Sequence, residues 1–287
     1  MKVISTACAL LAFVLPTTVT AQGINSNVAL PVAEGEVIWR SQLRYLQATD
    51  DPSPQDREVR ALLQPQTLVY GLSPRFTAFS TLPILTRRWI ESDAGGVQRD
   101  SAIGDLKVIG RYTFFADDYA ALSTRRVALI GGVKFPTGSD RFGTPTFDPI
   151  VGAVGTWAAN RHELDVDLLY TIGTKRHDFE TGDRIQYDLA YRYRLWPKRF
   201  GRRLLQVNGL VELNGRWAAR SREDGSTLRE SGGHVLFLSP GVQIAALRWI
   251  VEASVQIPVA QDLNGPQTET DFVGVLSVRI PFEIPWK

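Results

Sequence analysis

The 287-residue chain carries 32 Lys and Arg against 30 Asp and Glu, a formal net charge of +2 at pH 7, and it has one cysteine, Cys8. A charge this close to balance argues against a nucleic-acid partner, which calls for a strongly basic surface. Because Cys8 lies in a segment that we expect to be removed, neither disulfides nor thiol chemistry is expected.

The first residues of the chain are predicted to be a secretory signal. Lys2 gives the charged start, an apolar stretch covers residues 3–15, and the small residues Val19 and Ala21 precede Gln22. We expect residues 1–21 to be removed and residues 22–287 to form one domain outside the cytoplasm. A short membrane anchor is the alternative, but the apolar stretch is well below the roughly twenty residues that a spanning helix needs. No later segment is apolar enough for a membrane helix.

Most of the remaining chain alternates apolar and polar residues, which indicates strands with one apolar and one polar face. Within residues 162–172, for example, Leu164, Val166 and Leu168 alternate with Glu163, Asp165 and Asp167. A helix would mix these two sets. The alternating runs predict about twelve strands, at residues 36–47, 60–72, 75–85, 104–115, 125–135, 149–159, 161–172, 184–196, 204–217, 233–244, 249–259 and 271–282.

The connections between these runs alternate in length. Short ones fall at residues 73–74, 160 and 245–248, somewhat longer ones at 116–124 and 197–203, and long polar ones at 48–59, 86–103, 136–148, 173–183, 218–232 and 260–270. Long loops on one side and short turns on the other are typical of outer-membrane barrels. The runs also match the roughly nine to eleven residues of a tilted membrane strand, whereas soluble strands usually have about five or six. The sequence therefore predicts an all-β protein, a transmembrane antiparallel up-and-down β-barrel of about twelve strands, with its short turns in the periplasm.

Aromatic residues of the apolar parity gather near the strand ends, as in the two aromatic girdles of a membrane barrel. One set is Trp39, Tyr70, Phe76, Phe114, Tyr193, Trp249 and Phe282, and the other is Tyr45, Phe135, Tyr170, Tyr187, Trp217 and Phe272. Ordinary core packing is the alternative for any single member. The apolar last strand resembles the signal that the barrel-assembly machinery reads, although Pro281, Pro285 and the final Lys287 depart from it. We expect outer-membrane lipid and this machinery as partners.

The charged residues of the polar parity must face the lumen, since a basic side chain facing lipid near the midplane costs roughly 2 to 4 kcal/mol. The candidates for the lumen or a constriction are Arg40, Arg44, Lys107, Arg111, Lys134, Glu163, Asp165, Asp167, Asp188, Arg192, Arg194, Glu212, Arg216, Glu252 and Arg279.

Acidic and basic candidates are expected to meet on one hairpin. Across the 173–183 loop, Glu163 and Asp165 should lie near Arg192 and Arg194, and Asp167 should lie near Asp188. This arrangement predicts either a charged constriction that selects polar solutes or a salt-bridged filler that rigidifies the barrel.

A second group is expected at the closure seam of the barrel. Arg40 and Arg44 of the first strand should adjoin Arg279 of the last, with Glu252 one strand further. The group either attracts anions or closes the structure. If it attracts anions, neutral residues in place of Arg40, Arg44 and Arg279 should reduce the anion preference.

Several short stretches resemble the bacterial outer-membrane family grouped as the MetA-pathway of phenol degradation. They are Gly104-Asp105-Leu106 with Gly110, Arg111 and Tyr112; residues 131–138 (GGVKFPTG); Phe147-Asp148-Pro149; residues 236–241 (LFLSPG); and residues 255–259 (VQIPV) before Gln261-Asp262. The resemblance implies a transmembrane barrel associated with the uptake or passage of small molecules, among them aromatic compounds. It carries over no catalytic residue.

Enzymatic alternatives have weak support. A lipase-type barrel needs a lipid-facing serine beside a histidine, and His162 has Leu164 as its neighbour on the same face. A protease-type barrel needs acids and a histidine at the outer rim, where Asp50-Asp51 and His177-Asp178 could meet. We expect no enzyme, no catalytic residues, no metal and no cofactor.

The 136–148 connection leaves one question open. Residues 136–139 (PTGS) fail as a phosphate loop because Lys134 precedes the glycine and a strand hairpin follows. The sequence does not decide whether residues 140–148 stay outside or fold inward as a constriction. The expected function is an outer-membrane channel for small molecules, with aromatic or anionic solutes as candidates. The alternatives are a non-conducting structural or adhesive barrel with a plugged lumen and an outer-membrane hydrolase.

Overall fold

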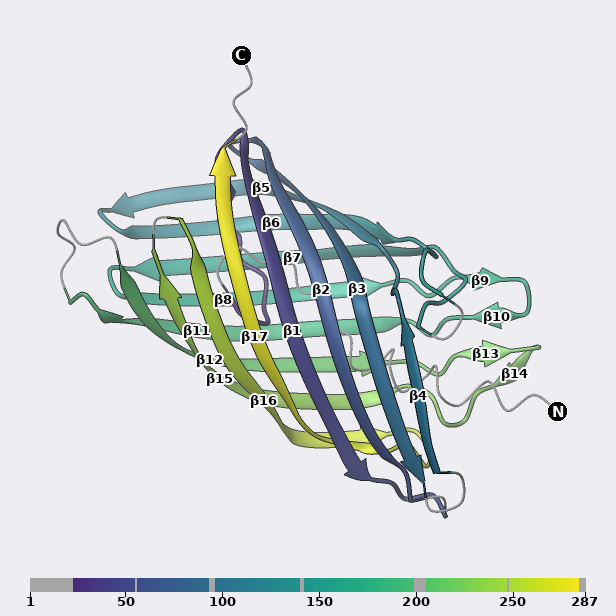
Figure 1. Ribbon diagram of the computed structural model, residues 1–287. Helices are drawn as coiled ribbons and strands as arrows, with labels where there is room; N and C mark the ends of the chain where they lie inside the picture. Colours follow the sequence, from purple (N-terminus) through teal and green to yellow (C-terminus); the bar gives the residue numbers. More distant parts are fainter. Residues whose placement is uncertain are drawn as a thin grey trace.

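A computed structural model describes residues 23–54, 56–92, 96–139, 142–198, 205–246 and 248–283, so the predicted signal at residues 1–21 lies outside the described residues. Twelve long antiparallel strands form a closed barrel (Figure 1). They are β1 (Glu36–Asp50), β2 (Glu58–Ser73), β3 (Phe76–Ser92), β5 (Lys107–Ala120), β6 (Ser123–Lys134), β7 (Asp148–Ala159), β8 (His162–Thr171), β11 (Arg184–Trp196), β12 (Gln206–Ala218), β15 (Gly233–Ala245), β16 (Ile250–Leu263) and β17 (Glu269–Glu283).

Every barrel strand pairs with the barrel strands before and after it in the sequence, and β1 closes the ring by pairing with both β2 and β17. This arrangement satisfies the backbone groups of both would-be edges, which a strand in hydrocarbon requires. The predicted up-and-down barrel of about twelve strands is therefore confirmed. No helix among the described residues is long and apolar enough to span a membrane.

The strands do not stop where the alternation fades. The predicted 86–103 connection contains the C-terminal part of β3 and a further strand, β4 (Gly96–Ala102), which pairs with it. At the other end, β5 and β6 continue to a tight turn at Ala121 and Leu122, where Leu122 has a φ of 60°. The strands of the front wall in Figure 1, among them β17, β1, β2 and β3, tilt steeply. The barrel has one end with short turns, which we call the turn end, and one end with long loops, which we call the loop end.

Two of the long loops carry small hairpins. One consists of β9 (Lys175–Arg176) and β10 (Phe179–Glu180), and the other of β13 (Arg222–Glu223) and β14 (Ser226–Thr227). Since β10 pairs with β13, the hairpins join into a four-stranded sheet that projects from the loop end (Figure 1).

The outer face of the barrel is apolar, as the alternation predicts. Large exposed side chains there include Leu68, Phe114, Leu129, Val166, Leu168, Val211, Val242, Val255 and Leu276. The expectation that the inner face is ionic is only partly right, because inward positions of β2, β3 and β5 to β8 carry a buried apolar cluster. Its members are Ala29, Val32, Val69, Phe79, Ile109, Ala128, Ile130, Ile150, Val154 and Leu169. Apolar and charged side chains therefore share the inner face of these strands.

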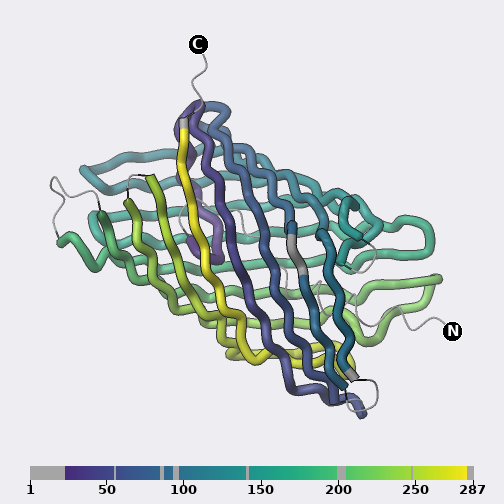
Figure 2. The backbone as a smooth tube through the Cα atoms, in the orientation of Figure 1, coloured from purple at the N-terminus to yellow at the C-terminus, as the bar shows by residue number. Residues whose placement is uncertain are grey.

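The described chain begins inside the barrel. Residues 23–33, which we call the lumenal segment, precede β1 and lie within the ring of strands, where the purple start of the tube is seen in Figure 2. Ile24, Asn25, Ser26, Val28 and Ala29 are all 0% exposed. The segment therefore fills part of the space that the ring of strands encloses.

Candidate functional site in the barrel lumen

The first part of the lumenal segment is held by one carboxylate of the wall. Glu212 on β12 accepts hydrogen bonds from the backbone N–H groups of Ile24 (3.2 Å) and Asn25 (3.0 Å). It also accepts from the side-chain amide of Asn25 (2.7 Å) and from the hydroxyl of Ser26 (2.8 Å). Charged acceptors make the stronger hydrogen bonds in such networks, so Glu212 fixes this part of the segment.

The middle of the segment is held by β8 and β7, which follow β12 and β11 around the wall. Asp167 on β8 accepts from the backbone N–H of Asn27 (2.8 Å) and from its side-chain amide (3.0 Å). The Thr156 hydroxyl on β7 accepts from the N–H of Ala29 (2.8 Å). Both N–H groups are thus bound by wall side chains rather than by another strand.

Guanidinium and hydroxyl groups bind the carbonyls of the same segment. Arg111 on β5 donates to the carbonyl oxygens of Val28 (2.5 Å) and Leu30, and the Thr113 hydroxyl donates to the carbonyl of Ala29 (3.0 Å). The Arg111 guanidinium also lies 4.9 Å from the centre of the Phe79 ring, a cation–π contact. Side chains of the wall therefore hydrogen-bond both the N–H and the C=O groups of the extended segment.

The predicted group at the closure seam is a buried ion triad. Glu252 lies between Arg279 (2.7 Å) and Arg40 (3.2 Å). Each arginine also donates to the lumenal segment, Arg279 to the carbonyl of Gly23 (2.5 Å) and Arg40 to that of Ile24 (2.8 Å). The triad thus links the strands that close the barrel, β1 and β17, to the lumenal segment.

The fourth member expected at the seam, Arg44, has a different partner. It donates to the side-chain oxygen of Gln256 (2.6 Å).

A row of buried acids lies along β8 and β11. Glu163 is opposite Arg192 and forms an ion pair with it, and Asp167 is opposite Asp188. Asp165 lies opposite Ala190 and accepts from the Thr156 hydroxyl (2.5 Å).

The remaining predicted partner of these acids, Arg194, points elsewhere. It donates to the side chain of Asn160 in the β7–β8 turn (3.3 Å). The acidic row is therefore only partly neutralised by ion pairs to its neighbouring strand.

Basic groups gather toward the loop end of the lumen. The charged neighbours of Lys107 are Arg184, Lys134, Arg216 and Asp105. Lys134 forms ion pairs with Asp105 (3.2 Å) and with Asp148 (3.0 Å), and Arg184 pairs with Asp148 (2.8 Å).

Arg216 lies among acids, with Asp188, Asp167 and Glu212 as its charged neighbours. Thirteen of the fifteen predicted lumen residues are buried, and Lys107 and Arg192 are half-buried. That they form a constriction stays a prediction.

Of the connection whose direction the sequence left open, residues 142–148 turn inward. Phe142 is 6% exposed and belongs to an apolar cluster with Leu46, Leu63 and Val273 of the wall and with Ile24 of the lumenal segment. The loop is held by Asp105, which accepts from the backbone N–H groups of Gly138 and Thr144 (both 2.9 Å). The loop narrows the lumen from the loop end.

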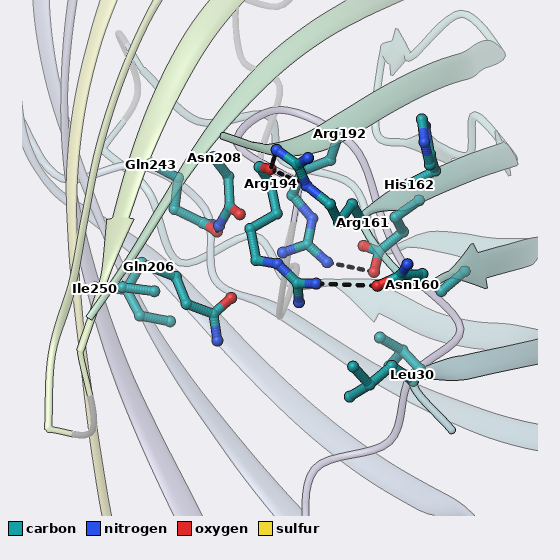
Figure 3. Close-up of a pocket in the computed structure, with 14 residues that line it drawn as sticks. Leu30, Asn160, Arg161, His162, Arg192, Arg194, Gln206, Asn208, Gln243 and Ile250 are labelled. Atoms are coloured by element: carbon teal, nitrogen blue, oxygen red, sulfur yellow. Dashed lines mark hydrogen bonds and ion pairs between the residues drawn. The ribbon is translucent and has the colours of Figure 1, made fainter. Parts of the chain in front are cut away.

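At the turn end the lumen opens into a cavity of about 420 Å³, shown in Figure 3. We call this cavity the vestibule. Its polar lining comes from the ends of several strands and their turns, namely Asn160, Arg161, Glu163, Arg192, Arg194, Gln206, Asn208 and Gln243. Leu30 of the lumenal segment also lines it, so the segment forms the inner limit of the vestibule.

Sequence reasoning missed the lumenal segment altogether. It has neither strand alternation nor a charged residue between Gly23 and Ala33. One signal is in the wall, where two glycines leave room for the segment that a larger side chain would fill. A Cβ on Gly71 would lie 1.9 Å from the carbonyl oxygen of Ala33, and one on Gly241 would lie 2.7 Å from the side chain of Ile24.

A closed twelve-stranded barrel with an apolar outer face and a polar lumen is an outer-membrane protein. The chain belongs to the family described as "Putative MetA-pathway of phenol degradation", whose model matches residues 64–257. No curated protein matches the chain.

Among solved structures, the chain resembles the COG4313 outer membrane channel from Pseudomonas putida F1, with a TM-score of 0.69 and 14% identity over 88% of this chain and 98% of that one. It also matches the translocator domain of the autotransporter NalP from Neisseria meningitidis, with a TM-score of 0.48 and 12% identity over 86% of this chain and 88% of that one. A third match is the CymD monoaromatic hydrocarbon channel, with a TM-score of 0.41 and 9% identity over 88% of this chain and 90% of that one. The first of these likenesses supports the barrel fold.

Proposed function

We propose that this protein is a channel for small molecules in the bacterial outer membrane, and that the lumenal segment closes it in the arrangement described. In this proposal residues 1–21 are a signal sequence that is removed on export. The last strand, β17, would be read by the barrel-assembly machinery during insertion.

The observation that carries the proposal is that the lumen is filled by a segment that is not one of the barrel strands. The barrel strands are joined by continuous backbone ladders, whereas residues 23–32 are bound to the wall through side chains such as Glu212, Asp167 and Arg111. Local openings occur where few backbone ladder bonds hold a segment. The segment can therefore leave while the barrel stays intact, and its departure would join the vestibule to the rest of the lumen.

The lining of the lumen favours solutes with both an apolar and a polar part. The apolar cluster that includes Val69, Phe79 and Ile109 lies on the inner face, and it packs against Ala29 and Val32 of the segment. The acidic row and the basic groups line the same lumen, partly on the same strands, such as β5, β6 and β8. Aromatic compounds with a hydroxyl or carboxylate group fit this combination, and the anion preference expected from Arg40, Arg44 and Arg279 stays a prediction.

A second candidate function is a non-conducting structural barrel. The buried triad of Arg40, Glu252 and Arg279 and the inward Phe142 favour it, because both fill the lumen with well-packed groups. Under this reading the lumenal segment is a permanent part of the core.

The hydrolase alternative has no comparable support in the structure. His162 shares a hydrogen bond with the hydroxyl of Tyr191 (2.6 Å) and lies against the Tyr193 ring. Asp51 is bound by Arg57, and His177 lies in the turn of the β9–β10 hairpin with a φ of 54°.

The test is conductance in planar bilayers before and after the segment is cut from the barrel. A protease site inserted between Ala33 and Glu34, which are both exposed, allows the barrel to assemble with its segment in place. We expect the intact protein to be closed most of the time and the cut protein to conduct steadily. If the cut barrel is correctly folded, has lost the fragment and still carries no current, the channel proposal is wrong.

A further inference from the structure

We propose that the lumen is a binding groove for short extended peptides, and that the lumenal segment occupies it as an internal ligand. This inference rests on the proposed function, since a free peptide enters the groove only after the segment has left. It names a solute class for the same site: chains of about ten residues with free backbone N–H and C=O groups, the length of the segment itself.

The first argument is the way in which the segment is bound. Between Gly23 and Val32, N–H groups donate to Glu212, Asp167, Thr156 and Thr77, and carbonyls accept from arginines and from a threonine hydroxyl. These contacts are made to backbone atoms, so they would be available to a peptide of another sequence. Charge-assisted hydrogen bonds are also roughly twice as strong as those between neutral groups.

The second argument is the alternation of donor and acceptor groups along the groove. Arg279 and Arg40 bind the carbonyls of Gly23 and Ile24, Glu212 binds the following N–H groups, and Asp167 binds that of Asn27. Arg111 then binds two further carbonyls. A small aromatic molecule could use only one or two of these groups at a time, whereas an extended peptide satisfies them together.

The third argument is the shape of the wall. Gly71 and Gly241 leave room where the backbone or a side chain of the segment comes closest, since any Cβ there would collide with Ala33 or Ile24. Between them the apolar cluster receives Ala29 and Val32. The groove therefore accepts small and medium apolar side chains beside its backbone-binding groups.

The experiment uses the cut barrel and a synthetic peptide with the sequence of residues 23–33 (GINSNVALPVA). After the cut fragment has been washed away, we expect the peptide, added to the turn-end side, to block the current. A peptide of the same composition in scrambled order controls for side-chain specificity and should still block, although more weakly. A fully N-methylated backbone version should block at least about tenfold less well, because it lacks the donors that Glu212 and Asp167 bind.

A wall variant supplies the matched control. In Glu212→Gln the block by the peptide should weaken by about tenfold or more, whereas Asp148→Asn should leave it unchanged, because the buried Asp148 carboxylate lies at the loop end, where it pairs with Lys134 and Arg184. Equal block by the normal and N-methylated peptides would overturn the inference.

The outcomes separate this inference from the channel proposal. If the cut barrel conducts and the peptide does not block it, the channel stands and the peptide groove is wrong. If the cut barrel does not conduct, binding of the fluorescently labelled peptide to it, measured by anisotropy, still tests the groove. Absence of binding in that measurement would also overturn it.

Discussion

Glu252 is the residue that brings three charges together in the interior of the barrel. Glu252 is 1% exposed, and its carboxylate accepts from both Arg40 and Arg279. Removing one partner from a buried ion group leaves uncompensated charge, which costs about 3 to 5 kcal/mol. We therefore expect Glu252→Ala to lower the free energy of unfolding by about that amount, measured by urea denaturation in detergent micelles.

The matched control for this prediction is Glu58→Ala. Glu58 pairs with Arg60 at 3.0 Å, but both side chains are exposed. The loss should stay below about 1 kcal/mol. Similar losses for the two variants would show that the triad contributes no more than a surface pair.

Asp51 makes a pH-dependent contact in the loop between β1 and β2. Burial acts to raise the pKa of its carboxyl, but hydrogen bonds from Arg57 and Ser53 outweigh it and lower the pKa from 3.8 to about 2. Because the folded pKa is depressed, the contact stabilises the loop fully above pH 3.8 and is lost as the pH falls through about 2.

The measurement is the NMR shift of the Arg57 amide proton, which is donated to the Asp51 carboxylate at 2.9 Å. We expect it to titrate with a midpoint near pH 2. In Asp51→Asn the titration should vanish. A midpoint at the ordinary value for an aspartate would contradict the account.

The lumenal segment is the element on which the function depends, and its release can be followed with a cysteine. In Ser26→Cys the thiol replaces a hydroxyl that is buried against Glu212. We expect slow reaction with a water-soluble thiol reagent and a rate at least about tenfold higher when Glu212→Gln weakens the contacts that hold the segment.

Asp148→Asn in the same Ser26→Cys background is the control, since Asp148 is a buried carboxylate that pairs with Lys134 and Arg184 at the loop end. It should leave the labelling rate unchanged. Equal acceleration by the two substitutions would mean that the lumen loosens as a whole and that Glu212 has no special hold on the segment.

For the molecule as a whole, the sequence predicts the barrel well because each strand has to keep one face in lipid. That demand produces the alternation in β8 and β11 and sets their register, in which Glu163 meets Arg192 and Asp167 meets Asp188. Strand ends were less predictable. Beyond the lipid no face of a strand has to be apolar. The C-terminal part of β3 and β4 therefore carry charges such as Arg88 and Asp100, which pair with each other.

The contents of the lumen were not predictable from alternation. Inward positions can be apolar when something apolar covers them, as Ala29 and Val32 cover Val69 and Phe79. The segment that provides this cover has no charged or aromatic residue and is bound largely through its backbone, so its own sequence carries little sign of its place. The inward position of Phe142 could not be decided for the same reason, because two phenylalanines in a polar loop, Phe142 and Phe147, have no periodic pattern.

The central claim is that the barrel conducts only when the lumenal segment leaves, and a reversible tether tests it most directly. Asn27 and Asp167 meet side chain to side chain at 3.0 Å, and the only natural cysteine is Cys8 in the predicted signal. In a variant with Asn27→Cys and Asp167→Cys, single-channel recording under oxidising conditions should show a closed barrel, and addition of a reductant should produce openings. Equal current before and after reduction, with the disulfide verified by mass spectrometry, would contradict the account.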